Sequence, residues 1–340
     1  MAKAGANYRV GTLYSLVTIA LLAVQHPLSL LAAEKFSVVN FVFATQVILL
    51  FSVPLLLRTS KARRDFRSLI TSAAYLKYFF VLLVIGLVGH VLYFIALSKG
   101  HPVTLAAVLN LSPFWAAMVA LVISKKAVPT SYATFFSCLA LAFVGAMMIA
   151  FSQSKDLSFS SLGSLSPYWA FAIPVPICFA LSGTLIGKWF VDFDEMACIA
   201  VTFVTSSAVL IPITALVSFY RSDLGVFRDA GLELTLLTIG TVLGASVGLV
   251  VYQASLSVTD NDNGFVSMFF LLGPVLTSLL SLVLSPWIPE LKFEAGPLFL
   301  AGMALVAAPI FVFSWRARNS DRKATSKRES REEEPALARS

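Results

Sequence analysis

Long apolar runs separated by short polar segments dominate the chain. An α-helix rises 1.5 Å per residue, so about 20 apolar residues cross the roughly 30 Å of hydrocarbon in a bilayer. The apolar residues are continuous within each run rather than alternating, which is typical of membrane helices and not of a membrane barrel. We predict ten transmembrane helices, over residues 10–32, 37–57, 76–98, 103–123, 130–151, 167–189, 195–219, 233–257, 264–286 and 295–315.

The composition agrees with hydrocarbon as the main surroundings of the protein. Hydrophobic residues make up 58% of the chain and charged residues 13%, whereas soluble domains carry about 25% charged residues. The first run lacks a small-residue cleavage site followed by a soluble domain, so we interpret it as a span rather than a signal peptide. Cys138, Cys178 and Cys198 all lie within apolar runs, where we expect packing rather than a disulfide or metal site.

The distribution of Lys and Arg predicts the orientation. The basic residues concentrate in segments 58–67 and 316–339, next to apolar runs, which argues against a nucleic-acid partner. With the N-terminus in the cytoplasm, the opposite side holds just six of the 25 basic residues: Lys35, Lys99, Lys155, Arg221, Arg228 and Lys292. Because cytoplasmic loops are enriched in Lys and Arg, we expect both termini inside, and a multi-pass protein of the bacterial inner membrane.

These spans divide the chain into an all-α integral membrane protein with two halves. We expect a cytoplasmic N-terminus over 1–9, five helices over 10–151, a linker over 152–166, five helices over 167–315, and a charged tail over 316–340. The tail has almost no apolar residues, so we expect it to be disordered. The basic connection after the second span has the pattern of an amphipathic helix on the membrane surface.

The two halves share landmarks in the same order. A span containing Leu111-Ser112-Pro113 is followed by a basic turn and by Phe143-Val144-Gly145; in the second half, Leu272-Gly273-Pro274 is followed by a turn and by Leu300-Ala301-Gly302. Five spans is an odd number, so the second copy must enter the membrane upside down. Such inverted repeats are a recurrent plan of secondary transporters.

This pattern resembles the EamA-like family of the drug/metabolite transporter superfamily. The resemblance rests on Ala96 to Ala150 and Ser255 to Phe313, and it implies ten helices as two inverted five-helix repeats and a transport function. The sequence departs from the family in the acidic stretch Asp260-Asn261-Asp262-Asn263-Gly264. No Asp or Glu lies in the middle of a predicted span, whereas the small multidrug exporters of the superfamily use a glutamate in the first helix. A proton-coupled exporter of cationic drugs is therefore disfavoured.

Polar side chains at membrane depth need a partner or water, so they are the candidates for substrate contacts. Each of them could instead form a bond between helices. Grouped by predicted span, the candidates of the first half are Gln25 and His26, Gln46, His90 and Tyr93, and Asn110 and Trp115; those of the second half are Ser182, Lys188 and Gln253.

Proline and glycine positions predict where helices bend. We expect hinges at Pro27, Pro113, Pro174, Gly244, Gly248 and Pro274, because proline removes a helix hydrogen bond and glycine lacks a side chain. At Pro27 the freed carbonyl requires a polar neighbour or a cavity.

The sequence favours a secondary transporter that binds a small neutral or zwitterionic, amino-acid-like solute and works by alternating access. A nucleotide-sugar or sugar-phosphate antiporter of the same fold would need several cavity-facing bases, and Lys188 is the one candidate. A membrane-embedded lipid enzyme would need convergent catalytic groups, and a passive channel is a further alternative. We predict no enzyme activity, metal or cofactor, and the sequence leaves open whether two copies form a homodimer.

Overall fold

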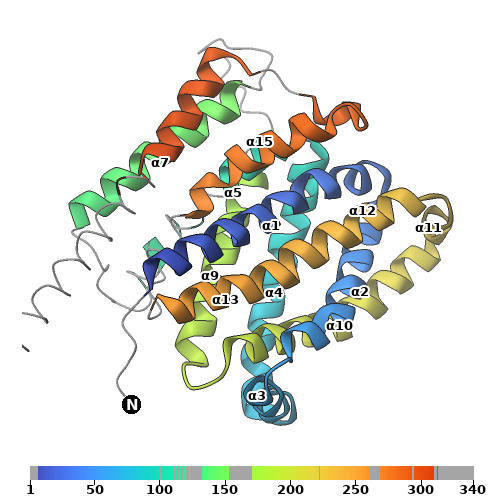
Figure 1. Ribbon diagram of the computed structural model, residues 1–340. Helices are drawn as coiled ribbons and strands as arrows, with labels where there is room; N and C mark the ends of the chain where they lie inside the picture. The colour runs from blue at the N-terminus through green and yellow to red at the C-terminus, as the bar shows by residue number, and fades with distance from the viewer. Residues whose placement is uncertain are drawn as a thin grey trace, which may run out of the picture.

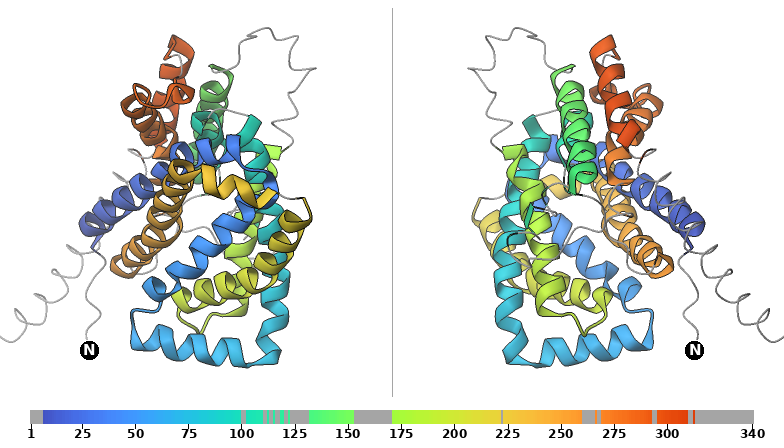
Figure 2. Two further views of the ribbon diagram at one scale, coloured as in Figure 1. Left: turned by 90° about the vertical axis from the view of Figure 1, so that its right-hand side faces the viewer. Right: turned by 90° about the vertical axis from the view of Figure 1, so that its left-hand side faces the viewer.

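The computed structural model describes residues 7–99, 102–109, 112, 115, 118–119, 122, 132–152, 171–221, 223–259, 266, 269–292, 295–309 and 312. Throughout these residues the regular structure is helical, with no strand. The helices form a bundle, and the short helix α3 lies across one end of it (Figures 1 and 2). The predicted all-α class is confirmed.

The helices of the first half are α1 Tyr8–Lys35, α2 Val38–Leu56, α3 Ser60–Thr71, α4 Ala73–Lys99, α5 Pro102–Leu109 and α7 Tyr132–Ser152. The second half begins with α9 Pro174–Trp189, α10 Glu195–Tyr220, the turn η2 Asp223–Gly225 and α11 Val226–Asp229. A continuous helical rod follows, made of α12 Gly231–Thr241, the π-helical η3 Val242–Gly248 and α13 Leu249–Val258. The last elements are η4 Phe269–Leu272, α15 Gly273–Leu284, η5 Pro289–Leu291 and a helix over Pro297–Pro309.

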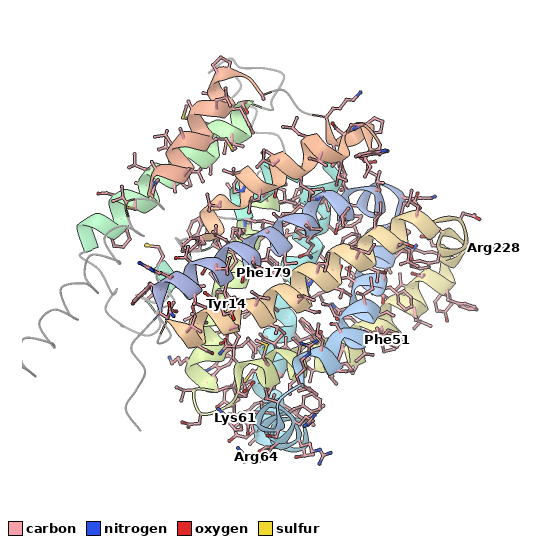
Figure 3. All side chains as sticks on the ribbon, in the orientation of Figure 1. Tyr14, Phe51, Lys61, Arg64, Phe179 and Arg228 are labelled. Carbon is pink, nitrogen blue, oxygen red and sulfur yellow. The ribbon has the colours of Figure 1, made fainter. Side chains whose placement is uncertain are left out.

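Five helices are long and apolar enough to cross a membrane: Tyr8–Lys35, Val38–Leu56, Ala73–Ser98, Glu195–Tyr220 and Gly231–Val258. Shorter apolar helices cover Phe136–Ile149, Pro174–Ile186, Gly273–Leu284 and Pro297–Pro309. Large apolar side chains also cover much of the outer surface; Phe51 on α2 is 81% exposed (Figure 3). An apolar exterior on this scale indicates lipid rather than water, so the protein is embedded in a membrane. Of the predicted fourth span, 103–123, the structure describes residues 103–109, 112, 115, 118–119 and 122.

Polar side chains begin several of these helices. The Ser37 hydroxyl accepts a hydrogen bond from the Asn40 amide at the start of α2, and Thr59 accepts one from Ala62 at the start of α3. The Asp194 carboxylate accepts two, from Met196 and Ala197, at the start of α10. Such caps satisfy amide groups that have no partner within the helix. They fix where each apolar run becomes a helix.

A polar seam joins α2 to α10 within the apolar bundle. The Ser206 hydroxyl donates to the Gln46 side-chain oxygen (2.9 Å), and Ser207 donates to the Gln46 backbone carbonyl (3.0 Å). Further along, the Ser218 hydroxyl donates to Asn40 Oδ1 (2.6 Å). Gln46, Asn40 and Ser207 are at most 2% exposed. Each of these buried polar groups is therefore paired within the protein, as hydrocarbon surroundings require.

Two glycines allow α7 and the Pro297–Pro309 helix to cross closely. A Cβ on Gly145 would lie 2.6 Å from the Gly302 carbonyl oxygen, and a Cβ on Gly302 would lie 2.6 Å from the Gly145 carbonyl oxygen. The contact is thus reciprocal. Small residues at such crossings let helix backbones approach, which favours association in a membrane.

Replacing Gly145 with alanine should lower the melting temperature in detergent by several degrees. The new methyl group would force the helices apart, and overpacking of this kind costs about 1–3 kcal/mol. Gly86→Ala is the matched control, because a Cβ at Gly86 meets nothing within 4 Å and alanine favours a helix by about 1 kcal/mol over glycine. An equal loss in both variants would contradict the close crossing.

Candidate functional site

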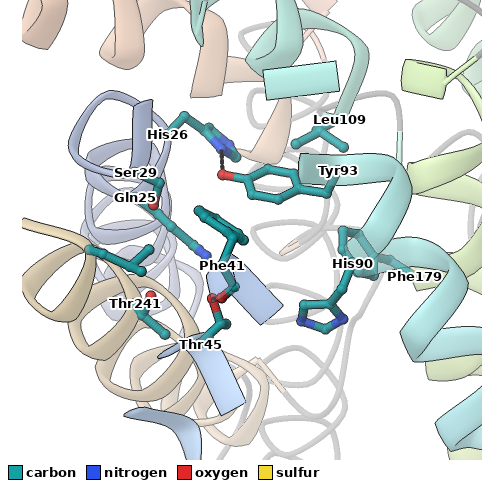
Figure 4. A pocket seen from close by; sticks show the side chains of 11 residues that line it. Gln25, His26, Ser29, Phe41, Thr45, His90, Tyr93, Leu109, Phe179 and Thr241 are labelled. Carbon is teal, nitrogen blue, oxygen red and sulfur yellow. Dashed lines mark hydrogen bonds between the residues drawn. The ribbon is translucent and has the colours of Figure 1, made fainter. Parts of the chain in front are cut away.

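A cavity of about 80 Å³ lies inside the bundle. The helices α1, α2, α4, α5, α9 and α12 contribute side chains to its wall (Figure 4). The residues that line it are Gln25, His26, Ser29, Phe41, Thr45, His90, Tyr93, Leu109, Phe179, Leu237 and Thr241. Four of the predicted substrate contacts therefore meet at one site: Gln25 and His26 of the first span, and His90 and Tyr93 of the third.

A hydrogen bond between His26 and Tyr93 spans one side of the cavity. His26 Nδ1 lies 3.1 Å from the Tyr93 hydroxyl, and the ring centroids are 5.8 Å apart (Figure 4). Tyr93 is 6% exposed and also packs beside Phe41, with 6.5 Å between the ring centroids. The bond joins α1 to α4 and leaves the aromatic rings as part of the cavity wall.

His90 offers a second imidazole, about one helical turn from Tyr93. Its Nδ1 lies 2.7 Å from the Gly86 carbonyl oxygen, which can only accept, so Nδ1 carries the proton. In the neutral ring Nε2 then bears a lone pair and can accept a hydrogen bond. The Phe179 ring stands edge-on to His90, with 6.3 Å between centroids. The histidine is thereby oriented by its own helix and by α9.

Gln25 is held where α1 crosses the rod of α12 and η3. Its Oε1 lies 2.7 Å from the position of a Cβ on Gly244, and its backbone oxygen lies 3.3 Å from that of a Cβ on Gly240. Gly248 faces Leu22, which like Gln25 belongs to α1. Gly240, Gly244 and Gly248 are spaced four residues apart, a pattern that brings membrane helices into close contact. The structure thus places the predicted hinges Gly244 and Gly248 in the contact with α1.

The π-helical segment η3 begins directly after Thr241, a residue of the cavity wall. The buried Thr241 hydroxyl has no hydrogen-bond partner in the part of the chain that the structure describes. Buried polar groups are normally paired with protein or water, and π-helical turns are frequent at functional sites. Both features mark this wall as a place for water or a ligand.

Pro27 lies inside α1, one residue after His26, and the helix continues through it. Because proline has no N–H, the Ala23 carbonyl loses its partner within the helix. The Thr277 hydroxyl of α15 lies 3.5 Å from this carbonyl oxygen and donates to it. The polar neighbour expected from the sequence is therefore a side chain of the second half.

Several predicted residues lie away from the cavity. Gln46 is bonded to α10, as described above. Ser182 and Lys188 lie on α9 outside the cavity wall, with Lys188 exposed and Ser182 partly buried. Gln253 is partly buried on α13, and its Oε1 has no partner among the described residues. Trp115 is partly buried outside the cavity wall, whereas Asn110 and Pro113 lie outside the described residues.

Two predicted hinge prolines stand at helix starts. Pro174 begins α9, and Pro274 follows Gly273 in the first turn of α15. Pro274 lies where the 3₁₀ turn η4 gives way to α15, so the described part of the ninth span changes its helix type there. Proline is favoured in a first turn because its missing N–H costs no hydrogen bond.

The sequence reasoning missed seven residues of the cavity wall: Ser29, Phe41, Thr45, Leu109, Phe179, Leu237 and Thr241. Ser29 had a signal, since it follows Gln25 by four residues and so shares its helix face. Phe41 and Phe179 had no such signal. Phenylalanine is common throughout the apolar runs, and no local pattern distinguishes these two from residues that face lipid.

The cavity wall is neutral and partly aromatic. Among its described residues none is an Asp, Glu, Lys or Arg. The described part of the chain also has no cluster of His, Cys, Asp and Glu that could hold a metal ion. The wall can therefore donate and accept hydrogen bonds and stack on aromatic or apolar groups, without neutralising a net charge.

Comparison with known proteins gives the fold alone. No family model and no curated protein matches the sequence. A solved structure described as "Crystal structure of protein" superposes with a TM-score of 0.58 and 15% sequence identity, covering 91% of this chain and 98% of its own. The similarity extends over nearly the whole of both chains, so the arrangement of helices is a recurring one.

Removing the Thr277 hydroxyl tests the contact with the carbonyl freed by Pro27. We expect Thr277→Val to reduce stability by about 0.5–1.5 kcal/mol, the usual net contribution of one hydrogen bond. In a Pro27→Ala background this cost should disappear, because the new backbone amide at position 27 then donates to Ala23 within the helix. The measurement is a double-mutant cycle of unfolding in detergent; purely additive effects would contradict the contact.

Proposed function

We propose that the protein is a secondary transporter that moves a small neutral or zwitterionic, amino-acid-like solute across the membrane by alternating access. The observation that carries this proposal is the neutral cavity inside a bundle of membrane-embedded helices, walled by α1, α2, α4 and α5 of the first half and by α9 and α12 of the second. Sites between the two halves are typical of transporters, because movement of one half against the other exposes them to each side in turn.

We further propose the ten-span, inverted-repeat plan of the EamA-like family of the drug/metabolite transporter superfamily. Under this plan α1 corresponds to α9, α2 to α10, and α4 to the rod from α12 to α13. The helix contacts support it: α1 packs on that rod, and α9 packs on α4. The corresponding helices α2 and α10 pack on each other.

The reciprocal contact of Gly145 and Gly302 supports the same plan. These two glycines are the matching landmarks of the two halves, and each meets the carbonyl of the other. A residue that touches its own counterpart lies next to a two-fold axis. The axis would pass between the last helices of the two halves, and between α2 and α10.

Contacts between helix ends support the alternation of sides that ten spans predict. The Asn7 amide donates to the Val258 carbonyl (2.7 Å), and the Asp194 amide donates to Asp65 (3.0 Å); all four residues belong to the predicted cytoplasmic side. Lys35 forms an ion pair with Glu233 (2.9 Å), and both belong to the opposite side. Each contact joins segments that the ten-span plan puts on one face.

The size of the cavity supports a conformational change during transport. Ligand pockets usually enclose about 300–1,000 Å³, and this cavity holds about 80 Å³. A metabolite would thus need helices to move apart on binding. The rod segment η3 lies beside the cavity and has a wider helical turn, so it is the place where we expect that movement.

The cavity chemistry supports a substrate without phosphate groups. Phosphorylated substrates are held by Arg or Lys, which are absent from the described wall. Tyr93, His90 and Gln25 can donate and accept hydrogen bonds, while Phe41 and Phe179 offer aromatic faces. We therefore rank amino-acid-like solutes above nucleotide sugars and sugar phosphates.

Transport should depend on the polar wall of the cavity. In proteoliposomes, a panel of labelled amino acids, sugar phosphates and nucleotide sugars, tested with and without a proton gradient, should show saturable flux of an amino-acid-like solute. His90→Ala and Thr241→Val should each reduce this flux about tenfold or more, which corresponds to about 1.4 kcal/mol of lost interaction.

Thr235→Val is the matched control for Thr241→Val. Thr235 lies on the same helix but is exposed, and its hydroxyl donates to the Gly231 carbonyl one turn earlier. Removing that hydroxyl should therefore leave flux unchanged. Each variant is checked for insertion and melting temperature before flux is compared. Non-saturable flux would indicate a channel, and unchanged flux in both cavity variants would overturn the assignment of the site.

A further inference from the structure

The exposed side of α3 is strongly basic. Arg58, just before the helix, and Lys61, Arg63, Arg64 and Arg67 within it are all exposed. Arg64 Nε lies 3.6 Å from Asp65 Oδ1, but the other four have no ion pair among the described residues. Figure 3 shows Lys61 and Arg64 projecting from α3 away from the bundle. We call these five residues the α3 basic face.

The only acid of α3, Asp65, pairs with one of these five bases and is mainly engaged elsewhere. Asp65 is 8% exposed, and its Oδ2 accepts a hydrogen bond from the Asp194 backbone amide (3.0 Å) at the start of α10. A carboxylate at a helix N-terminus is stabilised by the helix dipole. Asp65 therefore serves to dock α3 onto α10, and apart from its 3.6 Å contact with Arg64 it leaves the positive charge of the exposed side unpaired.

The apolar side of α3 is already occupied by the protein. Leu69 is fully buried and packs in one cluster with Phe79 of α4, Phe190 and Val201, and Phe66 and Ile70 lie against the same cluster. An amphipathic helix normally binds a membrane by burying its apolar face among the lipid chains. For α3 that face is already covered, so its contact with lipid must be electrostatic.

The position of α3 puts the basic face at the level of the lipid headgroups. The helix directly follows α2 and precedes α4, and it crosses the end of the bundle between them (Figure 2). Headgroups add about 5–8 Å on each side of the hydrocarbon, and a helix is about 10–12 Å wide. A helix lying at the ends of two spans thus fills the headgroup layer.

Aromatic side chains beside α3 mark the same level. Tyr78 and Trp189 pack with 4.9 Å between ring centroids, and Lys77 Nζ lies 5.0 Å from the centre of the Tyr78 ring. Tyrosine and tryptophan gather where hydrocarbon meets headgroups. Basic groups just beyond such a belt lie among lipid phosphates.

We propose that the α3 basic face binds the phosphate groups of anionic phospholipids in the leaflet on its side of the membrane. Guanidinium groups match the geometry of phosphate oxygens and form paired hydrogen bonds with them. Clusters of four or more basic residues next to a membrane span attract anionic lipid. Since the helix is fixed to the bundle through Asp65 and Leu69, bound lipid would hold the connection between α2 and α4 in place.

The test is the melting temperature of the purified protein in detergent, with added phosphatidylglycerol or phosphatidylcholine. Phosphatidylglycerol should raise it by about 2–4 °C more than phosphatidylcholine at about 50 mM salt, the shift expected of a modest ligand stabilisation in a chain of this size. The difference should vanish at about 500 mM salt, because salt screens exposed charges. Inorganic phosphate alone should produce no shift, which separates a lipid site from a free-anion site.

The triple variant Arg63→Gln, Arg64→Gln, Arg67→Gln should lose the difference between the two lipids while keeping its melting temperature in phosphatidylcholine. The matched control, Arg221→Gln, Arg228→Gln and Lys292→Gln, removes three exposed bases that are predicted to lie on the opposite side of the membrane from α3. It should keep the difference in melting temperature between the two lipids. An equal loss in both triple variants would overturn the proposal. If the α3 variant does not fold, the unmodified protein decides: equal shifts with both lipids, or shifts that survive high salt, would overturn it.

Discussion

Polar groups at membrane depth must be satisfied within the protein, and the arrangement of this bundle depends on that constraint. Hydrocarbon offers no hydrogen-bond partner, so each buried donor or acceptor needs another helix, its own backbone or a wet cavity. Gln46 takes its partners from α10, and the Ala23 carbonyl, freed by Pro27, takes Thr277 of α15. These bonds connect helices far apart in the sequence. Among the described residues, buried side-chain oxygens without a partner include those of Thr241 and Ser29 at the cavity, and those of Thr18, Ser246, Gln253 and Ser281 outside its wall.

Much of the fold follows from apolar length. The first, second, third, seventh and eighth predicted spans are helices long enough to cross a bilayer, because a run of about 20 apolar residues has few other stable states. The helix α3 was also predictable, because the apolar and charged residues of that segment fall on opposite faces of a helix. The π-helical turn at η3 was not. It lies where Gly240, Gly244 and Gly248 pack against α1, and such a distortion arises from packing between segments rather than from local preference.

The candidate site was predictable in part, for a similar reason. Gln25, His26, His90 and Tyr93 are rare polar residues in apolar runs, so composition alone singled them out. Thr45 and Gln46 show the limit: both are polar neighbours on α2, yet Thr45 lines the cavity and Gln46 faces α10. Adjacent residues in a helix point about 100° apart, since 3.6 residues make one turn. Which of the two faces inward depends on the rotation of the helix, and packing with its neighbours sets that rotation.

The wide turn at η3 has a mechanical consequence for the rod that contains it. Each residue of a regular α-helix advances the chain by about 100° around the axis, and a π-helical turn holds more residues than an α-helical one. Tightening η3 to α geometry would therefore twist α13 relative to α12. Thr241 lies on one side of η3 at the cavity, and Ser255, bonded to Ser15 of α1 at 2.8 Å, lies on the other. A change of η3 between π and α geometry would therefore alter how the cavity end and the Ser255 end of this continuous helix are rotated relative to each other.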